Sequence, residues 1–184
     1  SLYYGLESAN ERIIKLVKKD TDIEAAKINL EQAKRVGIWS HVMCFYGFPS
    51  ETEEEAEDTR QFLIKNQAMI PSVEMYFFVL YKNAPVMFAA DEYKITVKDI
   101  PEHDLALDYY YTPESGQTTE EAMTRYENFY SNDFHPWAMR INAREHVFLY
   151  ITHFGTSDLP HLYVKNAPES EGFELPPKKC WDIR

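Results

Sequence analysis

The sequence predicts an α/β protein whose strands run parallel. Short apolar runs alternate with longer amphipathic segments over residues 1–81, and the first two runs end at Gly5 and Gly47. The resulting order is strand, helix, helix, strand, helix, strand. Because each helical connection returns the chain to the same end of the sheet, parallel strands are the simplest solution for this order.

The first apolar run, residues 2–4, indicates a buried strand. The helix after it is predicted to begin at Ser8, whose spacing to Glu11 fits a capping box. Two lysines follow its apolar stripe, at the favourable negative end of the helix dipole. That stripe consists of Ile13, Ile14, Leu16 and Val17. Because a strand needs neighbours for its backbone, we expect the chain to begin within a larger fold.

A second helix is predicted from a capping box at Thr21 and Glu24 to a stop at Gly37. Residues 38–46 indicate the next strand, which ends in a Gly-Phe-Pro turn at residues 47–49. The apolar stripe of the second helix consists of Ile23, Ala26, Leu30 and Ala33.

The third helix is expected to begin near Thr52, with Ser50 or Thr52 as its cap, and to continue to about Asn66. Residues 72–81 then form a strongly apolar run, which we predict to be one strand. The turn at Gly47 therefore lies at the carboxyl end of a strand, where α/β sheets and barrels bind ligands.

The pattern weakens from Asn83 onward, which divides the chain into residues 1–82 and a mainly helical C-terminal extension, residues 83–184. We expect the extension to cap the first region and to shape its substrate choice. Its predicted elements are a strand within 105–112, helices at 118–132 and 138–154, and an irregular tail from Pro168.

Composition excludes several classes of function. The net charge of −11 argues against nucleic acid as a partner, because phosphate binding needs a basic face. The sequence contains no apolar run long enough for a membrane span and no readable secretory signal, so we expect a cytoplasmic protein. Cys44 and Cys180 lie too far apart in sequence to form a cysteine-based zinc or iron–sulfur motif.

Other titratable residues give weaker signals. The acidic run at residues 51–58 is predicted to be a solvated helix face, although Glu51 could instead line a pocket. The spacing of the histidines fits no common metal-binding pattern, so no metal site is predicted. The histidines in question are His135, His146, His153 and His161.

Two motifs occur in an order and at a spacing that indicate a known family. They are "GLESANERIIKLVKKDT" at residues 5–21 and "GFPSET" at residues 47–52. Together they resemble the second half of the radical S-adenosylmethionine (radical SAM) barrel, in the branch that often carries a cobalamin-binding domain upstream. The resemblance covers residues 2–81. In that family the second motif is G-F-P-G-E-T; Ser50 replaces its last glycine, which is tolerable if the position needs no positive φ.

The resemblance implies a truncated βα barrel of parallel strands plus the C-terminal extension. The family's C-x-x-x-C-x-x-C loop, which binds a 4Fe–4S cluster, would then lie upstream in the same polypeptide. It also implies that Glu7, Ser8 and Lys19 help to hold S-adenosylmethionine, with Lys18 a near-equal alternative to Lys19. Phe78, Leu80 and Tyr81 would form a wall for the adenine.

Each of these residues also has a purely structural interpretation. Ser8 would simply cap a helix, Lys19 would be a solvated lysine at a helix end, and the residues around Leu80 would be core. Gly47, Pro49 and Thr52 are interpreted as architectural, and no catalytic residue is predicted within the chain.

The functional hypothesis is that a longer parent enzyme cleaves S-adenosylmethionine reductively to a 5′-deoxyadenosyl radical, which acts on an unidentified small-molecule or peptide substrate. The fragment alone is expected to be inactive, and use of cobalamin stays open. The alternative is a non-catalytic α/β module that binds other proteins.

Overall fold

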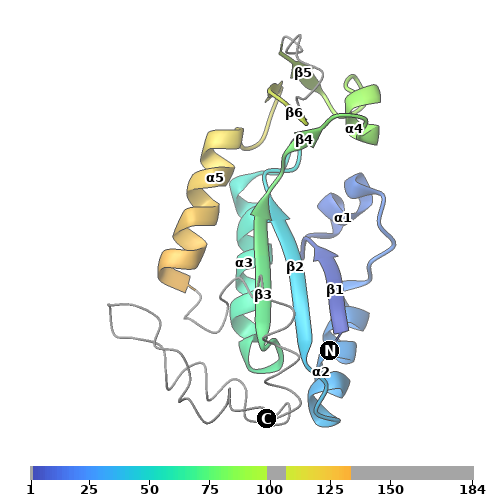
Figure 1. Ribbon diagram of the computed structural model, residues 1–184, viewed down its shortest axis with the longest axis vertical. Helices are drawn as coiled ribbons and strands as arrows, with labels where there is room; N and C mark the ends of the chain where they lie inside the picture. Colours follow the sequence, from blue (N-terminus) through green and yellow to red (C-terminus); the bar gives the residue numbers. More distant parts are fainter. Residues whose placement is uncertain (1, 99–106, 134–184) are drawn as a thin grey trace, which may run out of the picture.

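The computed structural model describes residues 2–98 and 107–133, which form a mixed α/β fold (Figure 1). Its central sheet consists of three strands, β1 (Leu2–Glu7), β2 (Ser40–Tyr46) and β3 (Ser72–Phe77). The strands lie in the order β1-β2-β3, and both neighbouring pairs are parallel. The predicted parallel arrangement is therefore confirmed, and each strand lies beside the one that precedes it in sequence.

Helices connect these strands as the sequence pattern predicts. The cap of the third helix is Thr52, which forms a capping box with Glu55 and so satisfies two backbone N–H groups at the helix start. The connecting helices are α1 (Glu11–Val17), α2 (Ile23–Arg35), α3 (Glu53–Lys65) and the short 3-10 helix η1 (Gln67–Met69).

The predicted caps of the first two helices are wrong. Asn10, not Ser8, caps α1, because the Ser8 hydroxyl is engaged with Thr59 and its neighbouring loop instead. Asp22, not Thr21, caps α2, and a carboxylate is the stronger cap of the two. Both helices consequently start later than their capping-box spacing suggested.

One face of the sheet packs against α2 and α3 and forms the main core. Side chains alternate along each strand, so Val42, Cys44 and Tyr46 of β2 all point to this face and are almost completely buried. The buried residues of the main core are Leu6, Leu30, Val42, Cys44, Tyr46, Ala56, Leu63, Ile70, Val73, Met75, Ala122 and Phe129.

The apolar run after Pro71 does not form one strand as predicted. β3 ends at Phe77, and the Phe78 N–H donates a last hydrogen bond to the Tyr46 carbonyl, 2.7 Å away. The chain then enters β4 (Leu80–Tyr81), which pairs antiparallel with β6 (Asp108–Tyr109). The run changes direction because its last residues pack into a separate cluster.

That second core lies beyond the carboxyl ends of the parallel strands (Figure 1). Its short elements are α4 (Pro85–Phe88), β5 (Ile95–Val97) and β7 (Tyr111–Pro113), with β5 and β7 antiparallel. Ile13 of α1 and Phe48 of the turn after β2 join this core, which ties it to the carboxyl edge of the sheet. Its members are Ile13, Phe48, Leu80, Val86, Tyr93, Ile95, Tyr109 and Tyr111.

Helix α5 (Thr119–Asn128) runs alongside β3 and continues into a π-helical turn, η2 (Phe129–Asp133) (Figure 1). Thr118 and Glu121 form the predicted capping box at its start. The Tyr130 hydroxyl accepts a hydrogen bond from the Met75 N–H at 2.8 Å and donates one to the Met75 carbonyl at 3.2 Å. Tyr130 therefore covers the outer edge of β3.

The described residues contain a three-stranded sheet that does not close into a barrel. No described helix is long and apolar enough to cross a membrane. Several sequence predictions lie outside the described residues: the helix at 138–154, the tail from Pro168, Cys180 and the four histidines discussed above.

Candidate functional site

The carboxyl edge of the sheet brings the two sequence motifs together. Glu7 ends β1 and is in register with Cys44, while Gly47 directly follows β2. Because β1 and β2 are parallel neighbours, both motifs leave the sheet at the same edge. The predicted parallel arrangement thus places the turns after β1 and β2 at one edge of the sheet.

Glu7 and Lys19 form an ion pair at this edge. The Lys19 Nζ lies 2.8 Å from the Glu7 Oε1, and the Glu7 side chain is only 18% exposed. Glu7 has a left-handed backbone, with φ of 65°, at an irregularity in the pairing of β1 with β2. A non-glycine residue in this conformation is strained, and such strain often occurs at functional sites.

Gly5 makes room for this arrangement. A Cβ at Gly5 would lie 2.8 Å from the Glu7 Oε1 and 3.9 Å from the Lys19 Nζ. The glycine that opens the first motif therefore lets the Glu7 carboxylate fold back over the strand. Any side chain at this position would displace the ion pair.

The structure distinguishes Lys19 from its neighbour. Lys18 points to Glu92, with its Nζ 2.9 Å from the Glu92 Oε1, and lies 5.4 Å from the centre of the Tyr93 ring. These contacts raise the pKa of Lys18, the hydrogen bond to Glu92 being the largest cause. Of the two lysines, only Lys19 contacts Glu7.

Ser8 is completely buried, and its hydroxyl forms hydrogen bonds with Thr59 and Asn10. Its Oγ lies 3.0 Å from the Thr59 Oγ1 and accepts a hydrogen bond from the Asn10 N–H at 3.1 Å. The Ala9 N–H also donates to the Thr59 Oγ1, at 3.0 Å. These bonds fasten the loop after β1 to α3.

The turn after β2 is built around Glu51, which has no solvent exposure. Its Oε2 accepts a hydrogen bond from the Gly47 N–H, and its Oε1 has no partner among the described residues. Burial is the main reason that the pKa of Glu51 is raised to about 7, with the Gly47 N–H acting in the opposite direction. The sequence allowed two interpretations of Glu51, a solvated helix face or the lining of a pocket. Neither predicted that the side chain would be completely buried.

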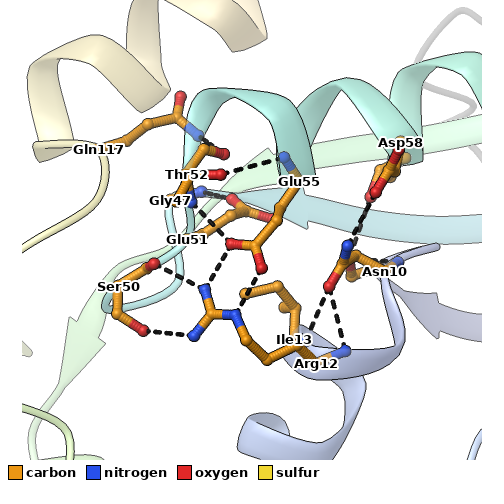
Figure 2. A network of polar contacts seen from close by, with 12 residues as sticks. Asn10, Arg12, Ile13, Gly47, Ser50, Glu51, Thr52, Glu55, Asp58 and Gln117 are labelled. Atoms are coloured by element: carbon orange, nitrogen blue, oxygen red, sulfur yellow. Dashed lines mark hydrogen bonds and ion pairs between the residues drawn. The ribbon is translucent and has the colours of Figure 1, made fainter.

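Arg12 links α1 to this turn (Figure 2). Its guanidinium makes a bidentate contact with the Glu55 carboxylate and also donates to the Ser50 Oγ at 3.0 Å and the Ser50 carbonyl at 2.8 Å. The side-chain hydrogen bond to Arg12 lowers the pKa of Glu55. Sequence reasoning missed Arg12, because only the fold brings it beside residues some forty positions later.

Residues from the C-terminal extension hold the same turn from the other side. The Gln117 N–H donates to the Glu51 carbonyl at 2.8 Å, and the Gln117 Nε2 donates to the Thr52 carbonyl at 3.2 Å (Figure 2). The Tyr111 hydroxyl donates to the Gly47 carbonyl at 3.2 Å. The turn is therefore fixed on both sides.

Two of the three residues predicted to form the adenine wall, Leu80 and Tyr81, lie in β4. Leu80 is completely buried in the second core, whereas the side chain of Tyr81 is exposed. Phe78 packs beside the second core and contacts the Phe48 ring, with 5.0 Å between ring centres. Leu80 and Phe78 thus belong to or pack against the second core beyond the carboxyl ends of the strands, whereas Glu7 and Lys19 contact each other.

Comparisons with known proteins give a partial likeness to an enzyme. No protein-family model matches the chain. The chain is 34% identical, over 65 residues, to a protein of Pyrococcus horikoshii that is named an uncharacterized methyltransferase. The match covers 35% of this chain and 14% of that protein, so the chain spans only a small part of its relative.

Proposed function

We propose that this chain is part of a radical SAM enzyme and that residues 2–81 form the rear of its barrel. The observation that carries the proposal is the shared carboxyl edge, where Glu7 with Lys19 and the turn after β2 leave neighbouring parallel strands. The partial match to a protein named a methyltransferase is compatible with an enzyme that uses S-adenosylmethionine, and the rest of the barrel would come from the same polypeptide.

The residues at this edge have the chemistry to hold S-adenosylmethionine. The Glu7 carboxylate accepts hydrogen bonds, which suits the ribose hydroxyls or the amino group of the ligand. The Lys19 ammonium has three donors and uses one on Glu7, so it can also bind the carboxylate of the ligand. The ion pair holds both side chains in place before the ligand binds.

Cys44 does not fit the role of a cluster ligand. It lies on the helix-covered face of the sheet, is almost completely buried, and has a thiol whose pKa is raised by burial. Iron–sulfur clusters need thiolates, which this environment disfavours. The proposal therefore assigns the cluster to cysteines elsewhere in the parent polypeptide.

In the parent enzyme, S-adenosylmethionine held by Glu7 and Lys19 would accept one electron from such a cluster, release methionine and supply a carbon radical for hydrogen abstraction. The chain's own contribution is to bind and orient the cofactor and to exclude water. The second core lies beyond the strand ends and can serve as a cover for that edge.

Binding of S-adenosylmethionine to the full-length parent protein tests this proposal. Calorimetry should show that Glu7→Gln and Lys19→Met each weaken binding by about tenfold, which corresponds to roughly 1.4 kcal/mol. Lys18→Met is the matched control and should leave binding unchanged, because Lys18 contacts Glu92 instead.

Two results would contradict the proposal. One is unaltered affinity in both the Glu7→Gln and Lys19→Met variants. The other is the lack of a C-x-x-x-C-x-x-C motif in the coding sequence upstream, which would favour the non-catalytic interaction module.

A further inference from the structure

The face of the sheet opposite the main core carries a polar cluster that no part of the proposed function uses. Alternation along the strands places Tyr3, His41, Met43, Glu74 and Tyr76 on this face. The strand register aligns Tyr3 with His41 and His41 with Ser72, and in the next row aligns Gly5 with Met43 and Met43 with Glu74. We call this set the open-face cluster.

Hydrogen bonds connect the cluster in a defined direction. The Trp39 indole can only donate, and it does so to the Ser72 Oγ at 2.9 Å. His41 lies between Ser72, whose Oγ is 2.8 Å from its Nδ1, and Glu74, whose Oε2 is 3.3 Å from its Nε2. Because a carboxylate only accepts, the Nε2 of His41 carries the proton and the Ser72 hydroxyl donates to Nδ1.

In the described part of the chain, no lysine or arginine pairs with the Glu74 carboxylate of this cluster. Burial is the main cause that lowers the pKa of His41, so its imidazole is neutral at pH 7. Among the described residues, the partners of the Glu74 carboxylate are His41 and the Tyr76 hydroxyl, which donates to its Oε1. These two donors fix the orientation of the carboxylate without neutralising its charge.

Two exposed tyrosines belong to this network: the Tyr76 hydroxyl contacts the Glu74 carboxylate, and the Tyr3 ring packs on His41, the other partner of Glu74. Tyr3 is 50% exposed and its ring centre lies 4.9 Å from that of His41, while Tyr76 is 48% exposed. The Glu74 side chain itself is 22% exposed and therefore accessible. A carboxylate among exposed aromatic rings is the combination that binds ammonium groups, through charge attraction and cation–π contact.

The proposed cofactor site borders the same face. Tyr3 and Gly5 share this face by alternation, and the Glu7 Oε1 lies 2.8 Å from the position that a Cβ on Gly5 would take. Gly5 and Glu74 are aligned across β2, so two strand spacings of about 4.8 Å each separate their backbones. A molecule bound at Glu74 would thus lie roughly 10 Å across the sheet from the Glu7–Lys19 pair.

We propose that the open-face cluster binds a small organic cation, a primary amine or alkylammonium group attached to an apolar body. Glu74 receives the ammonium, Tyr76 adjoins it, and Met43, which is aligned with Glu74 on the neighbouring strand, contacts the apolar part. Charge complementarity favours a cation over an anion, because the Glu74 carboxylate would attract an ammonium group and repel an anionic one. The inference does not rest on the cofactor assignment, since it concerns side chains of this chain alone.

Nuclear magnetic resonance titration of the isotope-labelled chain tests the inference with n-butylammonium as the probe. Binding should be in the millimolar range and should shift the signals of the Met43 methyl, the His41 ring and the Tyr76 ring. Neutral n-butanol, which has the same apolar body, should bind at least tenfold more weakly. Raised salt should weaken the binding of n-butylammonium but not that of n-butanol.

Glu74→Gln should weaken n-butylammonium binding at least tenfold, because the amide keeps the shape but removes the charge. Glu24→Gln, at an exposed position of α2, is the matched control and should bind as the unaltered chain does. The inference is overturned if butanol and butylammonium shift the same signals equally, or if the Glu74→Gln variant binds as before. The inference is also overturned if n-butylammonium shifts the signals of other residues in the unaltered chain and not those of Met43, His41 and Tyr76.

Discussion

Glu51 lies where the turn after β2, the start of α3 and the segment before α5 meet. Its carboxyl group is buried, bonds the Gly47 N–H and leaves its Oε1 without a described partner. Removing a charge from water in this way favours the protonated form, which explains why the pKa of Glu51 is raised to about 7. At this residue, protonation is therefore coupled to the stability of the turn.

Glu51→Gln should reveal this coupling as a pH dependence of stability. Because the pKa of Glu51 in the folded state, about 7, exceeds its ordinary value of 4.5, the contribution to stability is complete below pH 4.5. It falls as the pH rises from 4.5 through 7 and amounts to roughly 3 kcal/mol. Urea unfolding at pH 5 and pH 8 should show the Glu51→Gln variant gaining about this amount relative to the unaltered chain.

Glu54→Gln provides the control for this experiment. Glu54 is an exposed residue in the first turn of the adjoining helix α3, so its substitution should change stability equally at both pH values. A Glu51→Gln variant whose relative stability does not vary with pH would show that Glu51 is not buried as a carboxyl group.

Ser50 adopts a left-handed backbone, with φ of 71°, at the position where the resembled motif has glycine. Serine was expected to be tolerable if this position needed no positive φ, and the structure shows that it does need one. Ser50→Gly and Ser50→Ala both lose the hydrogen bond from Arg12 to the Ser50 Oγ, and only alanine keeps the backbone strain. The glycine variant should therefore have a free energy of unfolding about 1 kcal/mol higher than the alanine variant. Urea unfolding compares the two variants, and equal stabilities would contradict the strain argument.

At the scale of elements, α5 holds the carboxyl edge of the sheet in place. Gly47 has φ of 79°, and a Cβ there would lie 2.4 Å from the Ala122 Cβ. Close approach of α5 to the turn thus depends on two small residues. On the other side of β2, the loop after β1 is fastened to α3 through Ser8 and Thr59.

Gly47→Ala should destabilise the protein by about 3 kcal/mol, through backbone strain together with the clash against α5. Ala122→Gly in the same chain should recover part of that loss, because it removes the clash and leaves the strain. Thermal unfolding of the two single variants and the double variant gives the coupling between the positions. Purely additive effects would mean that α5 does not pack on Gly47.

Tyr130→Phe should expose the outer edge of β3. The substitution removes both hydrogen bonds to Met75 and should cost about 1–3 kcal/mol. Hydrogen exchange of the Met75 amide should become much faster, whereas the Cys44 amide in the central strand β2 should exchange as before. Unchanged protection at Met75 would contradict the role given to Tyr130.

The sequence was sufficient to predict elements whose signals are local. Hydrophobic periodicity placed the parallel strands, and Thr52 and Thr118 capped their helices as predicted because each has a glutamate three residues later. Ser8 has the same spacing to Glu11, but its hydroxyl forms a hydrogen bond with Thr59, which lies fifty-one positions away. Contacts of this range cannot be read from spacing, and the same holds for Arg12 and Glu55 and for the burial of Glu51.

At the scale of the whole molecule, the two cores join regions on either side of residue 82. The main core includes Ala122 and Phe129, and the second core includes Ile13 and Phe48. Ion pairs also connect the two regions, because Arg60 pairs with Asp133 and Arg125 pairs with Glu53. Neither region of the described chain buries its apolar residues alone.

Residues 2–133 should therefore unfold in one cooperative transition. Amide exchange under mildly denaturing conditions should give the same opening free energy for Val42 of β2, Tyr111 of β7 and Ala122 of α5. Earlier exchange at Tyr111 alone would show that the second core opens independently.

The two edges of the parallel sheet are unequal in the part of the chain described. Tyr130 closes β3, while β1 pairs only with β2 and leaves its other side free. In the proposed barrel, the unpaired flank of β1 is where the preceding parallel strand of the same polypeptide would pair, whereas Tyr130 occupies the opposite flank at β3. Extension of the described sheet by a further strand is therefore expected beside β1 and not beside β3.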